Sequence, residues 1–242
     1  MILPNVRASF GAGEVQALIR CLAQRTGLPA SRWEAQLRAE GLDALLDHPQ
    51  ALPALMSRAP AVAAIPAPLA FYVIARRALL DVGVRDRRIA DYIAALLTEF
   101  GYRDRAFRIH PYDEKEYRYL VDLVADLDAS GERRRFLLFA HLGNFALWLS
   151  GLFPDRITAR VQRRGAPGLR YYEDLGAFGY RSAAEFEVAS ALDLADLYRD
   201  AADLFGVLRR ALNRVSDRYF FPVPPDPAER LLRQVVDELE LN

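Results

Sequence analysis

The sequence has 242 residues, of which 52% are hydrophobic, and its 32 basic side chains are balanced by 32 acidic ones. This composition excludes an intrinsically disordered chain, and the zero net charge excludes an overall field that would draw the protein to nucleic acid or an anionic membrane. Cys21 is the only cysteine, which excludes an intrachain disulfide and a cysteine-based metal centre within one chain. Since residues 1–13 also lack the pattern of a secretory signal, we expect a cytoplasmic protein.

Apolar residues recur at three- and four-residue spacing along almost the whole chain, which predicts amphipathic helices. Ser31 followed by Glu34 has the pattern of a capping box, and Asp86 and Asp113 are expected to cap two further helices. Runs of alternating β-branched residues are missing, so the predicted strand content is near nil. Helices are expected over residues 14–25, 31–41, 42–47, 69–82, 86–100, 113–128, 132–152, 155–164, 167–180, 191–219 and 228–240.

Five prolines between residues 49 and 68 interrupt this helical pattern. Each proline removes a backbone donor and disfavours helix in the residue before it. We therefore predict an N-terminal helical subdomain over 1–59, a proline-rich linker over 60–68 and a main helical bundle over 69–242. One continuous domain over 1–242 is the alternative.

Two segments dominate the predicted bundle. Residues 132–152 are apolar on nearly all sides, whereas the apolar residues of 191–219 fall on one stripe of a long helix. The predicted fold is therefore all-α: an irregular multi-helix bundle with a central apolar helix, 132–152, packed on the long amphipathic helix 191–219. We expect no membrane span, because the apolar segment is short for one and contains a histidine and an asparagine.

Polar side chains on the apolar helix form the first candidate site. His141, Asn144 and Trp148 lie at i, i+3 and i+7 and so share one helix face. A buried imidazole and carboxamide need hydrogen-bond partners, which can be a bound ligand or cofactor or groups on other helices. As a functional site, His141 would act as a haem ligand or general base, with Asn144 orienting the bound group.

An arginine-rich segment forms the second candidate site. Residues 155–170 have a local net charge of +4, from five arginines and Asp155. The planar guanidinium suits phosphate or carboxylate, so Arg163, Arg164 and the neighbouring Tyr172 are predicted at the rim of a ligand site. A solvated face, partly paired with nearby acids, is the alternative.

Other chemistries are excluded or disfavoured. The sequence contains no P-loop, no complete dinucleotide-binding turn, no His-Glu-x-x-His and no nucleophile-elbow serine. The acidic stripe Asp193, Asp196, Asp200 and Asp203 has oxygen ligands that suit Mg²⁺ or Ca²⁺, but we interpret it as a solvated or ion-paired face and predict no metal site.

Three functions remain open, and no cofactor is indicated. The leading hypothesis is a non-catalytic protein that binds a small ligand or a protein partner, with a homo-oligomer as one form of partnership. The alternatives are an enzyme or cofactor-binding bundle with a pocket around His141 and Asn144, and a nucleic-acid- or anion-binding protein that uses the helix 155–170. Nucleic acid is disfavoured, because aromatic residues near these arginines are few.

Overall fold

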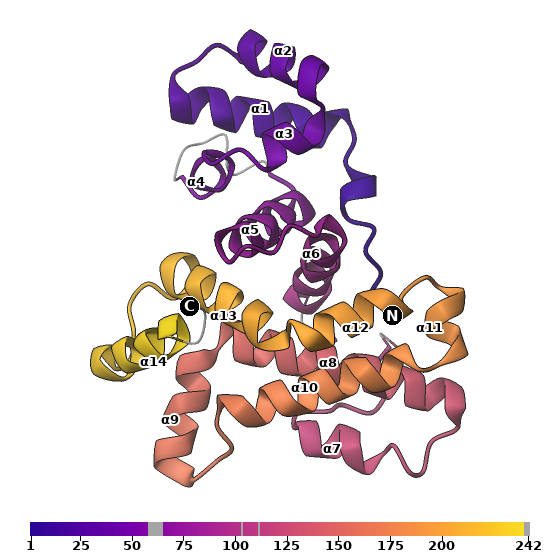
Figure 1. The fold of residues 1–242 in the computed structure, drawn as a ribbon. Helices are drawn as coiled ribbons and strands as arrows, with labels where there is room; N and C mark the ends of the chain where they lie inside the picture. The colour runs from indigo at the N-terminus through magenta and orange to yellow at the C-terminus, as the bar shows by residue number, and fades with distance from the viewer. Residues whose placement is uncertain (58–64, 103, 111, 240–242) are drawn as a thin grey trace. The chain divides into compact units, whose positions relative to one another are not determined.

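The computed structural model describes residues 1–57, 65–102, 104–110 and 112–239 (Figure 1). Over these residues the regular structure is helical and includes no strand, which confirms the predicted all-α class. Contacts divide the chain into two compact units, an N-terminal unit of residues 2–98 and a C-terminal unit of residues 99–242 with Met1. The division between the two units falls within the helix over residues 87–101. Residues 60–64 of the predicted linker lie outside the described residues, so the linker stays a prediction.

The N-terminal unit is a set of short helices. Its regular elements are η1 (Arg7–Ser9), α1 (Ala12–Thr26), α2 (Ala30–Glu40), α3 (Leu42–Leu46), α4 (Ala51–Leu55), α5 (Ala67–Asp81) and most of α6 (Arg87–Gly101). Asp86 caps α6 as predicted, since its Oδ1 accepts the Arg88 N–H at 2.6 Å. The capping box predicted at Ser31 was wrong: α2 begins at Ala30 after Pro29 and has no side-chain cap. Glu14 forms this contact instead, where it accepts the Gly11 N–H at the start of α1.

The C-terminal unit contains the longest helix of the described chain, α8 (Glu132–Leu152). Figure 1 shows α10 (Leu169–Ala184) beside it, and α12 (Ala195–Asp203) and α13 (Phe205–Val215) also pack in this group. The remaining elements are η3 (Arg105–Phe107), α7 (Leu120–Ala125), α9 (Pro154–Arg164), α11 (Glu187–Ala191), the π-helix η4 (Ser216–Phe220) and α14 (Pro227–Leu239).

Two predicted helices of this unit differ from the observed ones. The helix predicted over 113–128 is only α7, because the Asp113 carboxylate accepts a hydrogen bond from Arg134 and does not cap. The long helix predicted over 191–219 is divided at Leu204, where the backbone leaves helical values (φ −92°, ψ 6°). This break lets α12 pack against α10 while α13 packs against α8.

The central helix α8 is buried over most of its length, as predicted. Its closest packing is against α10, where Gly143 lies against the Tyr180 ring and Gly179 against the α8 backbone. A Cβ at Gly179 would lie 2.8 Å from both the Gly143 nitrogen and the Phe139 oxygen. Gly176 and Gly179 weaken helix 167–180 by propensity, yet they are the residues that let the two helices approach.

No single helix of the described residues is long and apolar enough to cross a membrane. Helices α8 and α9 satisfy the criteria of length and composition only as a pair, and they are bent by 89° at Phe153.

Buried arginines join α14 to the rest of the C-terminal unit. Arg209 on α13 is 3% exposed and donates to Glu173 at 2.6 Å and to Asp237 of α14 at 2.7 Å. Arg233 of α14 in turn donates to Asp217 at 2.8 Å, and Arg230 donates to Asp155 at 2.9 Å. The charged side of α14 is thereby held against α9, α13 and η4.

The close approach of α8 and α10 predicts a large effect of one methyl group. Gly179→Ala should lower the free energy of unfolding by about 3 kcal/mol, because the added Cβ meets backbone atoms that cannot rotate away. Gly13→Ala in α1 is the control, since a Cβ there has nothing within 4 Å and alanine favours the helix. Urea denaturation followed by circular dichroism measures both, and an unchanged midpoint for Gly179→Ala would contradict the packing.

The buried ion network predicts a second contrast. Asp217→Ala leaves Arg233 and Gln234 without their shared acceptor and should cost about 3 kcal/mol of stability, because the buried Arg233 loses the shortest of its ion pairs. Glu238→Ala removes a pair with Arg214 in which both side chains are well exposed, and it should cost less than about 1 kcal/mol. Thermal and urea unfolding of the two variants distinguish these values, and equal losses would argue against the network.

Candidate functional site

His141 lies in the core of the C-terminal unit and is 5% exposed. Its ring stacks on Phe145, with centroids 6.0 Å apart, and packs against Phe100. Burial lowers its pKa to about 3, assisted by the charge of Arg105, against a hydrogen bond to the Ala106 backbone that raises it. The imidazole is therefore neutral, and its Nε2 has no hydrogen-bond partner in the described part of the chain.

Asn144 is also buried, and it bridges the two central helices. Its Oδ1 accepts a hydrogen bond from the Tyr180 hydroxyl at 2.9 Å, between α8 and α10. This contact satisfies a buried carboxamide oxygen with a group on another helix, which fixes the relative position of the helices. Neither His141 nor Asn144 lines any of the cavities described below.

Trp148, one turn further along α8, does line a cavity. The cavity has a volume of about 330 Å³ and lies among α8, α9, the start of α10 and the segment 107–121. Trp148 packs edge-on against Phe153 with centroids 5.0 Å apart and stacks near Phe145 at 6.0 Å. The walls are mainly aromatic and aliphatic, and comprise Phe107, Tyr119, Leu120, Val121, Phe145, Trp148, Leu149, Phe153, Ile157, Pro167, Tyr171 and Tyr172.

Three guanidinium groups face this aromatic cavity: Arg118, Arg156 and Arg160. Arg118 lies over the Phe107 ring, 5.1 Å from its centroid, and forms an ion pair with Glu116. Arg156 and Arg160, one helical turn apart on α9, have no ion pair or hydrogen bond from their guanidinium groups among the residues that the structure places. Exposed Arg156 and half-buried Arg160 therefore place two positive charges at the edge of a mainly apolar cavity, without an acidic partner in the described part of the chain.

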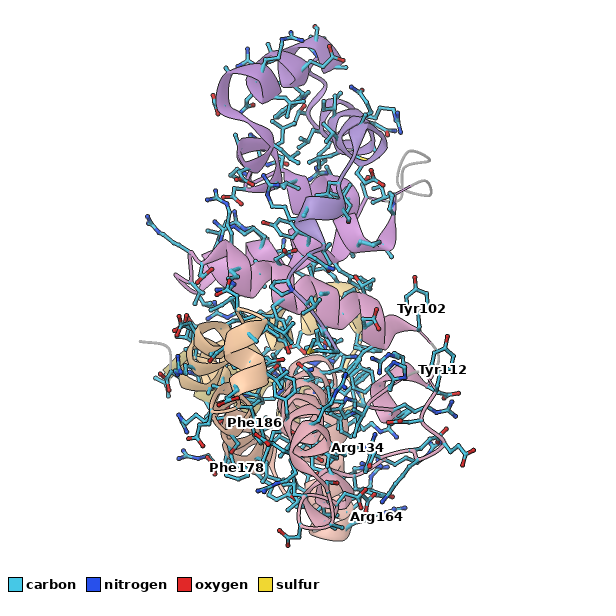
Figure 2. All side chains as sticks on the ribbon, turned by 90° about the vertical axis from the view of Figure 1, so that its right-hand side faces the viewer. Tyr102, Tyr112, Arg134, Arg164, Phe178 and Phe186 are labelled. Carbon is cyan, nitrogen blue, oxygen red and sulfur yellow. The ribbon has the colours of Figure 1, made fainter. Side chains whose placement is uncertain are left out.

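Tyr172 also lines this aromatic cavity, and the two remaining predicted residues do not. Burial raises the pKa of the Tyr172 hydroxyl, although nearby Arg160 and Arg156 lower it, so the group is a neutral hydrogen-bond donor. Arg163 borders a separate cavity of about 310 Å³ on another side of α9. Arg164 lies exposed at the surface near the end of α9 (Figure 2). The structure thus brings together Trp148 and Tyr172 and separates them from His141, Asn144, Arg163 and Arg164.

One wall of the aromatic cavity was not predicted from the sequence. Phe107 lies between two predicted helices, and residues 118–121 lie within the helix predicted over 113–128, which in the structure begins only at Leu120. Arg156 and Arg160 were visible as part of an arginine-rich helix. Spacing alone could not distinguish them from Arg163 and Arg164, because all four project at helical intervals.

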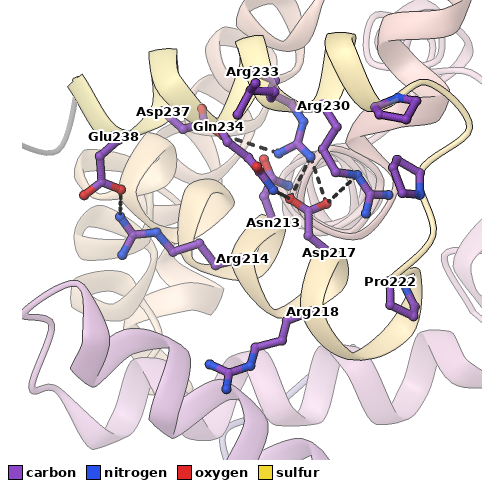
Figure 3. A pocket seen from close by; sticks show the side chains of 13 residues that line it. Asn213, Arg214, Asp217, Arg218, Pro222, Arg230, Arg233, Gln234, Asp237 and Glu238 are labelled. Carbon is purple, nitrogen blue, oxygen red and sulfur yellow. Dashed lines mark hydrogen bonds and ion pairs between the residues drawn. The ribbon is translucent and has the colours of Figure 1, made fainter.

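A larger cavity, of about 630 Å³, lies between α13, η4 and α14 (Figure 3). Its charged groups largely neutralise one another: Arg233 and Arg230 point toward Asp217, and Arg214 pairs with Glu238. Such paired side chains have their hydrogen-bonding capacity engaged within the protein. This cavity is therefore lined largely by the ion pairs that hold α14.

The acidic stripe contributes exposed ion pairs. Asp203 accepts a hydrogen bond from Arg181, and Asp196 pairs with Arg199 within α12. Asp193 lies before the helix in the left-handed region, with φ 56°. No group of three or more His, Cys, Asp or Glu side chains in the described ranges is arranged to hold a metal ion.

Comparisons of the chain with protein-family models, with curated proteins and with solved structures gave no match. The interpretation of the site therefore depends on its own geometry: an aromatic cavity of small-molecule size with two unpaired cations.

The buried neutral state of His141 predicts a pH dependence of stability. Its pKa is depressed in the fold, so below pH 6.5 the unfolded chain takes up a proton that the folded chain does not. The free energy of unfolding should fall by up to about 1.4 kcal/mol per pH unit between about pH 6 and pH 3 from this group. His141→Leu removes this contribution, which leaves a shallower slope in urea denaturation measured across that range. Identical slopes for the two proteins would mean that His141 titrates in the folded chain.

Proposed function

We propose that this chain is a non-catalytic helical protein that binds a small organic anion with a flat apolar body in the aromatic cavity. The anionic group is a carboxylate or phosphate held by Arg156 and Arg160, and the body lies against Trp148 and Tyr172. The observation that carries the proposal is the pair of guanidinium groups without an acidic partner at an aromatic wall.

Charge distribution in the C-terminal unit supports this proposal. Arg209, Arg230 and Arg233 are paired with carboxylates in the protein, whereas Arg156 and Arg160 are not. Asp155, the acid next to Arg156 in the chain, is engaged by α14. A guanidinium beside an apolar cavity gains most from an incoming anion, because the partly desolvated pair is screened less than one in water.

The size of the cavity limits the ligand. A volume of about 330 Å³ is at the lower end of the range for small-molecule sites and fits one ring system with its acid group. The aromatic edges and faces favour a planar body, and a neutral Tyr172 hydroxyl adds a donor beside the arginines.

The two alternatives have less support. An enzyme centred on His141 and Asn144 would need these groups to face substrate, yet both are buried and neither lines a cavity described above. Asn144 is bonded to Tyr180, and the His141 ring stacks on Phe145 of the aromatic wall. A nucleic-acid site would need an extended basic groove, whereas two of the four α9 arginines lie outside the aromatic cavity. We also propose a cytoplasmic location, which a single, buried and unpaired Cys21 supports.

Phenyl phosphate and phenol form a matched pair of probes, because they share a ring and differ in the anionic group. In a Trp33→Phe background the Trp148 indole N–H is the only tryptophan signal in a ¹⁵N NMR spectrum, since the chain has two tryptophans. We expect phenyl phosphate to shift this signal and to bind at least about ten-fold more tightly than phenol, as charge-assisted hydrogen bonds contribute about 1.5–3 kcal/mol each.

Two double variants locate the anion. Arg156→Gln with Arg160→Gln should remove the preference for phenyl phosphate and leave phenol binding unchanged. Arg163→Gln with Arg164→Gln removes the same charge from the same helix outside the aromatic cavity and should preserve the preference. If the two probes bind equally to the unmodified protein, or both double variants lose the preference alike, the proposal is wrong.

A further inference from the structure

Helix α14 is oriented with its charged side inward. Arg230, Arg233 and Asp237 are each at most 8% exposed. The aliphatic side chains on the opposite face are at least 49% exposed: Leu231 61%, Leu232 69%, Val235 49%, Val236 54% and Leu239 74%. This is the reverse of the pattern expected for a helix on the surface of a folded unit.

The ion network prevents α14 from rotating about its axis. Figure 3 shows Arg233 and Arg230 extending from α14 toward Asp217, and Arg209 of α13 reaches Asp237. Burying the leucines by rotating the helix would leave these cations and carboxylates without their partners. The exposed aliphatic face, defined here as Leu231, Leu232, Val235, Val236 and Leu239, is therefore held in place.

We propose that this aliphatic face is a homodimer interface, which pairs with α14 of a second copy of this chain about a two-fold axis. Leu231, Val235 and Leu239 lie at i, i+4 and i+8, so the stripe follows α14 from Leu231 to its last residue, Leu239, at a constant spacing. A two-fold pairing covers each stripe with an identical one, as in other isologous interfaces.

Charge around the face favours a second copy over an anionic bilayer. Glu229 and Glu238 are the acidic residues beside the stripe, and the phosphates of a bilayer would repel them. The Glu229 carboxylate has no ion pair in the described ranges, and α9, the helix next to α14, has exposed arginines that give a second copy groups of the opposite charge. The zero net charge of the chain also means that two copies do not repel each other.

The size of the face sets the expected affinity. One helix of 13 residues is about 20 Å long, so the pair buries an area near the lower limit for specific interfaces. We expect a reversible dimer with a dissociation constant in the micromolar range, and not an obligate one.

Sedimentation velocity of the full chain over a concentration series tests this pairing. The unmodified protein should shift from monomer to dimer across the micromolar range. Leu232→Glu with Leu239→Glu should stay monomeric, with at least a ten-fold rise in the dissociation constant. Leu192→Glu is the control, because this leucine is 40% exposed but lies after α11, outside the aliphatic face. The dissociation constant of this variant should be unchanged.

Cysteine cross-linking tests the two-fold geometry independently. In a Cys21→Ala background, the Val235→Cys variant should form an intermolecular disulfide between the two substituted positions on mild oxidation, because Val235 lies at the middle of the stripe. The Leu192→Cys variant should not. A protein that stays monomeric at hundreds of micromolar overturns the proposal. So does a dimer that persists in the Leu232→Glu, Leu239→Glu variant, or a monomer that sediments with vesicles of anionic phospholipid.

Discussion

The close contact between α8 and α10 is the constraint on which the C-terminal unit depends. Glycine at positions 143 and 179 lets the two helices approach to backbone contact. The Tyr180 hydroxyl then reaches Asn144 in the core. This contact brings the Trp148 end of α8 to the same cavity as Tyr172 at the start of α10. The aromatic cavity is therefore a consequence of where two glycines allow helices to meet.

Sequence periodicity predicted the all-α class and the central helix, but not every helix boundary or the contacts between helices. The bounds of α8 follow from an apolar run between Gly131 and Pro154, and its burial follows from the same run. The break at Leu204 was not predictable, because leucine is a good helix former and the stripe of 191–219 continues through it. Tertiary packing of α12 on α10 and α13 on α8 decides that break.

The candidate site was predicted in part for the same reason. A histidine and an asparagine on an apolar helix need partners, and the sequence could not say whether a ligand or the protein supplies them. The structure gives Asn144 a protein partner and places Trp148 and Tyr172 at the cavity. The wall formed by Phe107 and residues 118–121 depends on which segments pack beside α8 and α9, and local periodicity does not determine such contacts.

The position of Asp155 links the ion network of α14 to the charge of the cavity. This carboxylate is adjacent in sequence to Arg156 on α9, but it accepts hydrogen bonds from Arg230 and Arg233 of α14. Because one acid serves two buried cations, α14 is fixed with its aliphatic side outward. For the same reason, Arg156 and Arg160 lack the acid that the sequence places nearest to them. The pairing of Asp155 with Arg230 and Arg233 thus accounts for both the proposed anion site and the exposed aliphatic face.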